Sequence, residues 1–302
     1  MKTVIVTNHF VKFYSGSELI TIDLLSYFAS KADYKVYLAT FQVGNPLQQL
    51  IPKNVETINL SNQPMPIRQA DLIIGHHYDV IDKVLETVSC KNVVQNSLSP
   101  YCDIIEDYST HITKALANSA ETKRVKQYQT QLPIDIFVNS VNSSFINADR
   151  KQLTGTINKI AVITNHQWHK GITKKNVDII GSTQGKLVTA ELLKQYDVVV
   201  TIGRTVQMCL VLGIPVYCYD HFGGHGYITL HNIDFNEEMN FSGRQKDADF
   251  TEPKSHDFAK IFNDIYHNYM AVCTQQKQLI EIAKQRYNFE TNLNNVLKDI
   301  TI

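Results

Sequence analysis

The chain has 302 residues, 43% of them hydrophobic and 19% charged, and its 29 basic side chains (Lys and Arg) balance its 29 acidic ones (Asp and Glu). A chain of this length is long enough for two domains, each with its own core. The balanced charge argues against nucleic acid as the principal partner.

The N-terminal stretch MKTVIVTNHF is neither a signal peptide nor a membrane anchor, because polar residues interrupt its apolar run after a few positions. No other stretch approaches the ~20 apolar residues that a transmembrane helix needs. The cysteines are odd in number and scattered, which favours reduced, buried thiols over disulfides or a metal site. They are Cys90, Cys102, Cys209, Cys218 and Cys273. We therefore expect a cytoplasmic protein.

Short apolar runs alternate with helical or irregular segments through the first half of the chain. The runs cover 3–7, 34–40, 55–60, 70–75 and 91–95. This alternation predicts a parallel sheet with helices on both faces. After the first run, Ser15 and Glu18 have capping-box spacing, which predicts a helix that begins near Gly16.

Gly75, His76 and His77 stand at the carboxyl end of the strand predicted over 71–74. Open parallel sheets place ligands and chemistry at this edge. The spacing alone leaves two interpretations of the histidines open, a catalytic role and a structural one.

Asn118 and Ser119 predict the cap of a helix that starts at Ala120. This helix carries a small basic face, formed by Lys123, Arg124 and Lys126. Such a face is either merely solvated or a contact for anionic lipid or an acceptor.

The polar stretch 147–158 marks a domain boundary, which divides the chain into 1–150 and 151–286 with a last segment over 287–302. A new sheet is predicted to begin with the strand 159–164. His166 and His169 follow it at i and i+3, but no third ligand stands at suitable spacing, so we expect no metal there.

The most informative stretch is 197–226, which predicts a buried strand, a turn at Gly203, a short buried helix that ends at Gly213, a second strand and a glycine-rich loop. The N-terminus of a helix at the carboxyl edge of a sheet favours an anion. Gly203 allows close backbone approach, Arg204 can bind a phosphate with its guanidinium, and Thr205 can add a hydroxyl. An ordinary α/β turn with a surface arginine is the alternative.

A long loop is predicted from Gly226 to about residue 254, either a lid or acceptor-facing insertion or a disordered segment. Ser255 is predicted to cap a helix with an apolar stripe that includes Phe258 and Ile265. Two further helices, around 274–286 and 290–300, are expected to end the chain.

The succession of Asp197, an apolar run, Gly203-Arg204-Thr205, an apolar helix and the segment 223–227 resembles the donor-binding half of GT-B glycosyltransferases. It is most similar to the family 4 retaining enzymes of bacterial polysaccharide and lipopolysaccharide synthesis, and Asn-Phe-Ser-Gly-Arg at 240–244 also resembles that branch. The resemblance implies an α/β fold of two Rossmann-like domains facing a cleft. It also implies that 287–302 forms a helix that crosses back to the first domain.

The implied activity is transfer of a sugar from a nucleotide-sugar donor, UDP-linked, to a glycan or lipid-linked acceptor. The resemblance further implies retention of the anomeric configuration, no cofactor or metal ion, and peripheral association with the cytoplasmic face of the inner membrane. It assigns a catalytic role to His76 with the adjacent His77, close to the reacting sugar. The donor-binding residues that it implies are Gly16, Lys170, Gly203, Arg204, Thr205, Gly224 and Tyr227.

The sequence departs from the family at two glutamates, whose positions hold Val200 and Met208. In the family, the second glutamate normally forms hydrogen bonds with the ribose hydroxyls of the nucleotide. Glu237 or Glu238 could replace it, although no spacing argument supports either residue. This departure favours an alternative function, a non-catalytic GT-B subunit that stabilises a partner glycosyltransferase or recognises glycan. A sugar-nucleotide epimerase would need cleft carboxylates that the sequence does not place.

Overall fold

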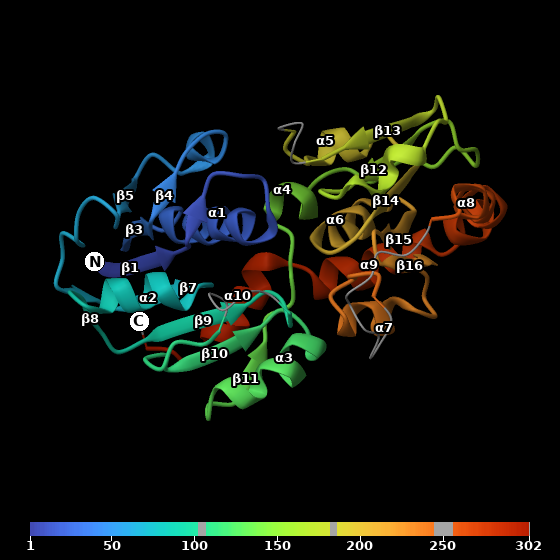
Figure 1. The fold of residues 1–302 in the computed structure, drawn as a ribbon. Coiled ribbons are helices and arrows are strands. Elements are labelled where there is room, and N and C mark those ends of the chain that lie inside the picture. The colour runs from blue at the N-terminus through green and yellow to red at the C-terminus, as the bar shows by residue number, and fades with distance from the viewer. Residues whose placement is uncertain (102–106, 182–185, 245–255, 302) are drawn as a thin grey trace. The chain divides into compact units, whose positions relative to one another are not determined.

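The chain forms two compact units in a computed structural model that describes residues 1–101, 107–181, 186–244 and 256–301 (Figure 1). Unit 1 comprises Met1–Phe137 together with Leu293–Ile302, and unit 2 comprises Val138–Asn292. Each unit is built of parallel strands and helices, so the α/β fold class predicted from the sequence is confirmed.

Unit 1 is built on a seven-stranded sheet in which every neighbouring pair is parallel. In sheet order the strands are β11 (Ile134–Ile136), β10 (Lys114–Ala117), β9 (Val93–Ser97), β7 (Leu72–Gly75), β1 (Lys2–Thr7), β3 (Tyr34–Thr40) and β5 (Val55–Asn59). Strands of such a sheet are covered on both faces, and Val4, Ile5 and Val6 in central β1 are accordingly all fully buried.

The remaining elements of unit 1 cover this sheet or extend its edges. The helices are α1 (Gly16–Ala29), α2 (Tyr78–Leu85) and α3 (Ala120–Lys126), with short 3₁₀ helices at Leu47–Leu50 and Gln127–Gln129. Two small parallel pairs join β2 (Phe10–Val11) to β4 (Gln42–Val43) and β6 (Gln69–Ala70) to β8 (Ser89–Cys90). The predicted cap of α3 is confirmed, since the hydroxyl of Ser119 accepts a hydrogen bond from the Thr122 backbone N–H at 3.1 Å.

Unit 2 contains a five-stranded sheet whose first four strands are parallel. In sheet order they are β13 (Val177–Ile180), β12 (Ile160–Ile163), β14 (Val198–Thr201), β15 (Val216–Asp220) and the antiparallel β16 (Gly223–Tyr227). The helical segments are α4 (Ser143–Ile146), a 3₁₀ helix at Gln167–Gly171, α5 (Ala190–Leu193), α6 (Arg204–Leu212), α7 (Ile233–Glu238), α8 (Phe258–Cys273) and α9 (Gln276–Arg286).

Successive side chains of β14 point to opposite faces of the unit 2 sheet and join different cores. Val199 packs in a buried cluster with residues of α6 and α9, among them Leu210 and Leu279. Val198 and Val200 pack in another cluster with residues of α8, among them Ile265. Helices therefore cover both faces of this sheet, and β14 is the buried strand predicted at the start of the stretch 197–226.

The prediction of a glycine-rich loop at 222–226 is wrong, because Gly223–Tyr227 forms the edge strand β16. A Cβ atom on Gly224 would lie 2.0 Å from the Cys218 carbonyl oxygen, so glycine is what allows this strand to pair closely with β15. The long loop expected after Gly226 is also interrupted, by helix α7. The predicted cap Ser255 lies outside the described residues, and α8 is capped by Asp257, whose carboxylate accepts from the Lys260 N–H.

The last helix, α10 (Phe289–Leu297), carries the chain back into unit 1, as expected for the C-terminal segment. Its Asn294 side chain accepts a hydrogen bond from the Tyr27 hydroxyl of α1. Beyond the helix, the Thr301 carbonyl accepts from the Asn92 amide just before β9. Leu293 is fully buried, so this return contributes to the core of the molecule.

The first crossing between the units lies at Phe137, N-terminal to the boundary expected at residue 150. Two contacts explain why 138–150 belongs to unit 2. Val141 forms a parallel bridge with Asn288, and Phe145 packs in the same buried cluster as residues of α6. The polar stretch 147–158, from which the boundary was predicted, begins only after these contacts with unit 2 have formed.

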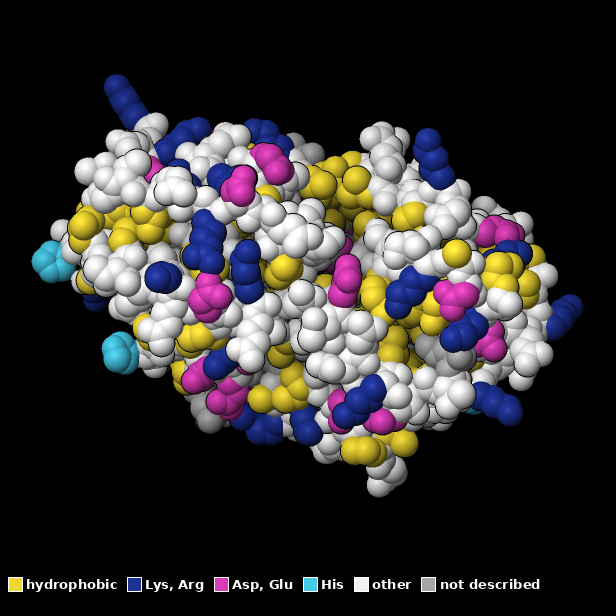
Figure 2. Space-filling view, turned by 180° about the vertical axis from the view of Figure 1, so that it is seen from behind, with side chains coloured by type: hydrophobic (Ala, Val, Ile, Leu, Met, Phe, Trp, Pro, Cys, Tyr) yellow, Lys and Arg dark blue, Asp and Glu magenta, His cyan; other side chains and the backbone are white. Residues whose placement is uncertain are grey.

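The described surface agrees with the composition. Figure 2 shows basic and acidic side chains interspersed over one face of the molecule. Among the described residues, no helix has the length and apolar character needed to cross a membrane. Cys90, Cys209, Cys218 and Cys273 are free thiols, and Cys102 lies outside the described residues.

Candidate functional site

Most of the predicted site residues lie at the carboxyl edge of the parallel sheet of their own unit, after β1 and β7 in unit 1 and after β12 and β14 in unit 2. Loops at this edge are where open α/β sheets bind ligands. Gly224 and Tyr227 lie instead in the antiparallel β16, where Tyr227 pairs with Tyr217 near the start of β15.

Gly203 turns the chain from β14 into α6. Its φ of +62° lies in the left-handed region that favours glycine, and a Cβ atom there would meet nothing within 4 Å. The Gly203 N–H donates to the Phe241 carbonyl at 2.8 Å, which ties the turn to the segment after α7. The space beside the turn and the first N–H groups of α6 are the features that an anion would use.

Arg204 and Thr205 open α6 and are both partly exposed. The Nε–H group of Arg204 donates to the Ser140 carbonyl at 2.8 Å, so this guanidinium lies beside the segment that precedes α4. One turn further, Gln207 is buried and its Oε1 has no hydrogen-bond partner among the described residues. Sequence reasoning passed over Gln207 because the motif directs attention to its neighbour, Met208.

Val200 and Met208, at the positions of the family glutamates, belong to the core of unit 2. They are 1% and 5% exposed. Val200 packs with residues of α8, and Met208 packs with the cluster around α6. A carboxylate at either place would have to be buried without compensation, which costs several kcal/mol.

The other predicted donor residues of unit 2 do not form one group. Lys170 is exposed in the 3₁₀ helix after β12. Gly224 lies in the paired part of β16. Tyr227 is 6% exposed, and its hydroxyl donates to the Ile265 carbonyl at 3.0 Å, while burial raises the pKa of this phenol well above its ordinary value.

A group of polar side chains that sequence reasoning had not connected lies at the ends of β12 and β15. The side chains of His166, Asp220 and His221, here called the histidine–carboxylate cluster, bring their ligand atoms within 4.8 Å of one another. The two imidazole rings stack with centroids 3.6 Å apart. His169, the partner that the sequence suggested for His166, instead has its Nδ1 2.9 Å from the His166 carbonyl oxygen.

In unit 1, Gly16 begins α1 and Glu18 lies in its first turn. Ser15 is the N-cap, but its hydroxyl donates to the Glu18 carboxylate, and Ser17 donates to the same carboxylate at 2.9 Å. Burial raises the pKa of Glu18 above its ordinary value. The space around Gly16 is open, since a Cβ atom there would meet nothing within 4 Å.

His76 and His77 follow β7 and are both buried, at 1% and 6% exposure. Burial lowers the pKa of His76 to about 4 and, together with the neighbouring His76, that of His77 to about 3. Both rings are therefore neutral at neutral pH. His76 Nδ1 lies 3.2 Å from the Asn96 carbonyl oxygen, which assigns it as the donor and leaves Nε2 as an acceptor with no partner among the described residues.

Further buried polar atoms without partners surround His76. They belong to Thr7 at the end of β1 and to Asn96 near the end of β9, whose side-chain oxygen and nitrogen are both unsatisfied. Gly75 makes the close approach between the strands, since a Cβ atom there would lie 1.8 Å from the Thr7 hydroxyl oxygen. Buried polar atoms are normally hydrogen-bonded, so this edge is suited to receive a hydroxyl or a water molecule.

A third histidine, His9, completes this edge and was missed in the sequence. Its Nδ1 lies 2.5 Å from a carboxylate oxygen of Asp79 at the start of α2, and its backbone N–H donates to His77 Nδ1 at 3.1 Å. A histidine held by a carboxylate through one ring nitrogen can take up a proton through the other. His9 stands two residues after β1, so a search that extends two residues beyond the end of each buried strand would have found it.

The basic face expected on α3 is smaller than the sequence suggested. Lys126 is 3% exposed, and its ammonium group lies 3.0 Å from the Asp107 carboxylate. The sequence shows three basic residues close together on this helix. It does not show that Lys126 is buried against Asp107.

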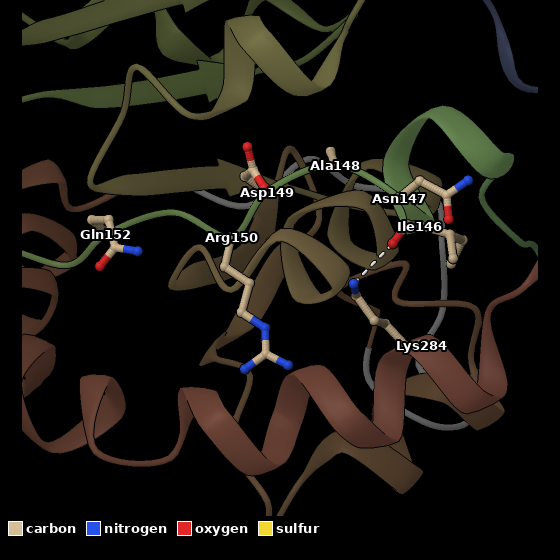
Figure 3. Close-up of a pocket in the computed structure, with 7 residues that line it drawn as sticks. All are labelled: Ile146, Asn147, Ala148, Asp149, Arg150, Gln152 and Lys284. Carbon is tan, nitrogen blue, oxygen red and sulfur yellow. Dashed lines mark hydrogen bonds between the residues drawn. The ribbon is translucent and has the colours of Figure 1, made fainter.

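The structure also has a shallow pocket of about 800 Å³ in unit 2, between the segment 146–152 and α9. Lys284 donates to the Ile146 carbonyl at 2.8 Å, and Arg150 is directed toward α9 (Figure 3). Arg150 pairs there with Glu281 at 2.6 Å. None of the predicted site residues lines this pocket.

Two units of parallel strands and helices, with a last helix that returns to the first unit, define the fold of GT-B glycosyltransferases. Solved structures with this fold match nearly the whole chain. HepE from Anabaena, in complex with UDP-glucose, has a TM-score of 0.64 at 14% identity over 99% of both chains. Sucrose-phosphate synthase from Thermosynechococcus elongatus has 0.60 at 10% over 99% of this chain and 98% of that one.

WaaG, a glycosyltransferase involved in lipopolysaccharide biosynthesis, has a TM-score of 0.54 at 8% identity over 99% of both chains. At these identities the likeness establishes the fold. The sequence itself matches no protein-family model and no curated protein.

Proposed function

We propose that this protein transfers a sugar from a nucleotide-sugar donor, UDP-linked, to a glycan or lipid-linked acceptor in the synthesis of a bacterial surface polysaccharide or lipopolysaccharide. The observation that carries the proposal is the full-length likeness to GT-B enzymes, one of them solved with UDP-glucose. The reaction takes place at the cytoplasmic face of the membrane and needs no metal ion or other cofactor.

The donor diphosphate is proposed to lie at the N-terminus of α6. Backbone N–H groups there, with Arg204, Thr205 and Lys170, would offset the charge that develops on the departing diphosphate. Gly203 supports this role because the space beside it is open. Gly16 stays a predicted donor contact. Gly224 and Tyr227 are not part of the proposed site, because Gly224 pairs with β15 and the Tyr227 hydroxyl donates to the Ile265 carbonyl.

The catalytic edge of unit 1 is proposed to receive the reacting sugar. A neutral His76 can accept a hydrogen bond from a sugar hydroxyl through its unpartnered Nε2, and Asn96 can both donate and accept. His77, neutral as well, would position the loop through the bond from His9. Transfer proceeds with retention, and stabilisation of the departing diphosphate is its largest catalytic contribution.

One observation favours an inverting mechanism for the same sugar transfer. The pair of His9 and Asp79 has the arrangement of an oriented general base, which would let the acceptor hydroxyl attack directly and invert the anomeric centre. The anomeric configuration of the product, read by NMR, separates the two courses. For inversion, His9→Gln is expected to lower turnover by about 10²-fold or more with little change in KM for the donor.

The non-catalytic alternative rests on the absence of the two family glutamates, whose positions hold the buried Val200 and Met208. Calorimetric titration of the purified protein with UDP, GDP, ADP and CMP separates it from the enzyme. Selective binding of UDP, weakened by about 1.5–3 kcal/mol in Arg204→Ala, is the expected result. A well-folded protein that binds none of the four nucleotides would contradict the proposed transferase and support the non-catalytic subunit.

A further inference from the structure

The histidine–carboxylate cluster of His166, Asp220 and His221 is the part of the unit 2 edge that the proposed function does not use. His166 comes from the loop after β12, and the other two residues come from the end of β15. Both strands neighbour β14 in the sheet, so the fold brings together side chains that are far apart in the sequence. Their ligand atoms lie within 4.8 Å of one another.

The loop that carries His166 is attached to Asp220 through one hydroxyl. Thr164 Oγ1 donates to Asp220 Oδ1 at 2.9 Å and accepts from the His166 backbone N–H at 3.0 Å. The His221 backbone N–H donates to the same carboxylate oxygen at 2.8 Å. Within the described residues, hydrogen bonds from a hydroxyl and from backbone N–H groups therefore position these three residues.

Asp220 accepts hydrogen bonds from a hydroxyl and a backbone N–H, but it has no lysine or arginine partner among the described residues. The residue is 2% exposed, and its ion-pair partner among the described residues is His221, at 3.6 Å. A buried carboxylate without a cation is costly.

One ring atom also lacks a partner. Nδ1 of His221 is buried and makes no hydrogen bond within the described residues, although it faces the Asp220 carboxylate. Buried polar atoms are normally satisfied, so an unsatisfied ring nitrogen beside a buried carboxylate is a specific sign of an absent third group. A cation would satisfy both.

We propose that His166, Asp220 and His221 form a mononuclear site for a zinc-class divalent ion. Two imidazoles and one carboxylate suit Zn²⁺, whereas Mg²⁺ and Ca²⁺ prefer oxygen ligands. Three protein ligands leave a fourth position open to water or an anion. The site is separate from the metal-independent transfer proposed above, and its existence does not depend on it.

Binding requires a small rearrangement of side chains. Ligands at about 2.0–2.1 Å from a tetrahedral zinc ion lie roughly 3.3 Å from one another, closer than the present limit of 4.8 Å. His166 is exposed and can swing, while Asp220 is held by Thr164. The buried carboxylate is thus the fixed part of the site and the exposed imidazole the adjustable part.

The test is a titration of the full-length, tag-free protein, after treatment with a chelator, with Zn²⁺ alone in competition with a chromogenic chelator. One equivalent is expected to bind, and Co²⁺ is expected to give the visible absorption of a four-coordinate site. His166→Ala, Asp220→Asn and His221→Gln are each expected to weaken binding by more than about tenfold. Their thermal unfolding is recorded alongside, so that loss of fold is distinguished from loss of ligand.

Two control variants make the result specific. His231→Ala removes an exposed histidine elsewhere in unit 2 and is expected to leave the affinity within about twofold. His169→Ala tests the surface pair with His166. The proposal is overturned if the protein binds no stoichiometric Zn²⁺, or if His169→Ala abolishes binding while the folded Asp220→Asn variant retains it. Because no nucleotide enters the titration, neither result bears on the transferase.

Discussion

At the scale of single residues, the edge of unit 1 is built from histidines with different environments. His76 and His77 are buried and neutral, whereas His9 is about one-fifth exposed and paired with Asp79. Removal from water explains the first two, because it disfavours the charged imidazolium. His76 can therefore accept a hydrogen bond through Nε2, and the contact of His9 with Asp79 is the geometry on which the proposed general base rests.

The buried His76 predicts a pH dependence of stability. Its pKa is about 4 in the folded protein and 6.5 ordinarily, so the unfolded chain binds more protons between these values. The free energy of unfolding is therefore expected to rise as pH increases through this window and to level off above it. From pH 7 to pH 5 the loss from this group is about 2 kcal/mol.

Denaturant unfolding of the wild type and of His76→Gln at pH 5, 6 and 7 measures this contribution. Glutamine keeps a donor for the Asn96 carbonyl and does not titrate, so its profile is expected to be flatter by the amount stated. Parallel profiles for the two proteins would show that His76 is accessible to protons in the folded state.

At the scale of elements, the apolar strands could be predicted because a strand covered on both faces needs a continuous run of buried side chains. The turn at Gly203 and the end of the helix at Gly213 could be predicted because a glycine interrupts the apolar sequence at each place. The strand β16 could not, because its glycines give the signal of a loop, whereas Gly224 is needed for the close approach to Cys218 of β15, which only the structure shows.

Some residues of the candidate site could likewise be predicted from the sequence, and others could not. His76 and Gly203 stand directly after strong strand signals, and sequence reasoning found them. The association of His9 with Asp79, or of His166 with Asp220, depends on which strands are neighbours in the sheet. No local sequence pattern gives the order of the strands in a sheet, so these pairs could be identified only from the structure.

Substitution of Gly224 tests the structural explanation of β16. In Gly224→Ala the added Cβ would meet backbone atoms of Cys218 and Tyr219, which cannot move without loss of strand pairing. We expect a loss of about 2 kcal/mol or more in the free energy of unfolding. Gly16→Ala, where the same atom meets nothing within 4 Å, is the matched control and is expected to change it by less than about 0.5 kcal/mol.

Equal stability of the two glycine variants would mean that β16 is not closely paired. A Gly224→Ala protein of wild-type stability that had lost only nucleotide binding would restore the interpretation of Gly224 as a donor-binding residue.

At the scale of the whole molecule, unit 1 is completed only by the end of the chain. Leu293, Val296 and Leu297 of α10 are all 9% exposed or less. Burial of three aliphatic side chains contributes roughly 5 kcal/mol. A chain that ends at Asn292 is therefore expected to lose the protection of β1 against hydrogen exchange while β14 keeps most of its own.

Mass-spectrometric hydrogen exchange of the shortened and complete chains measures both strands in one experiment. Leu293→Ala serves as a milder variant, with an expected loss of about 2–5 kcal/mol in stability. Unchanged protection of β1 in the shortened chain would show that unit 1 is stable without its last helix.

The path of the chain also has a mechanical consequence. Both ends of the described chain lie in unit 1, and the two passages into and out of unit 2 are joined by a hydrogen bond of 2.8 Å from Asn292 to Ser140 and by the bridge between Val141 and Asn288. A stretching force applied to the two ends would act first on unit 1 and on this tie. Unit 2 would carry tension only after the tie had broken, so it is shielded from loads that unfold its neighbour.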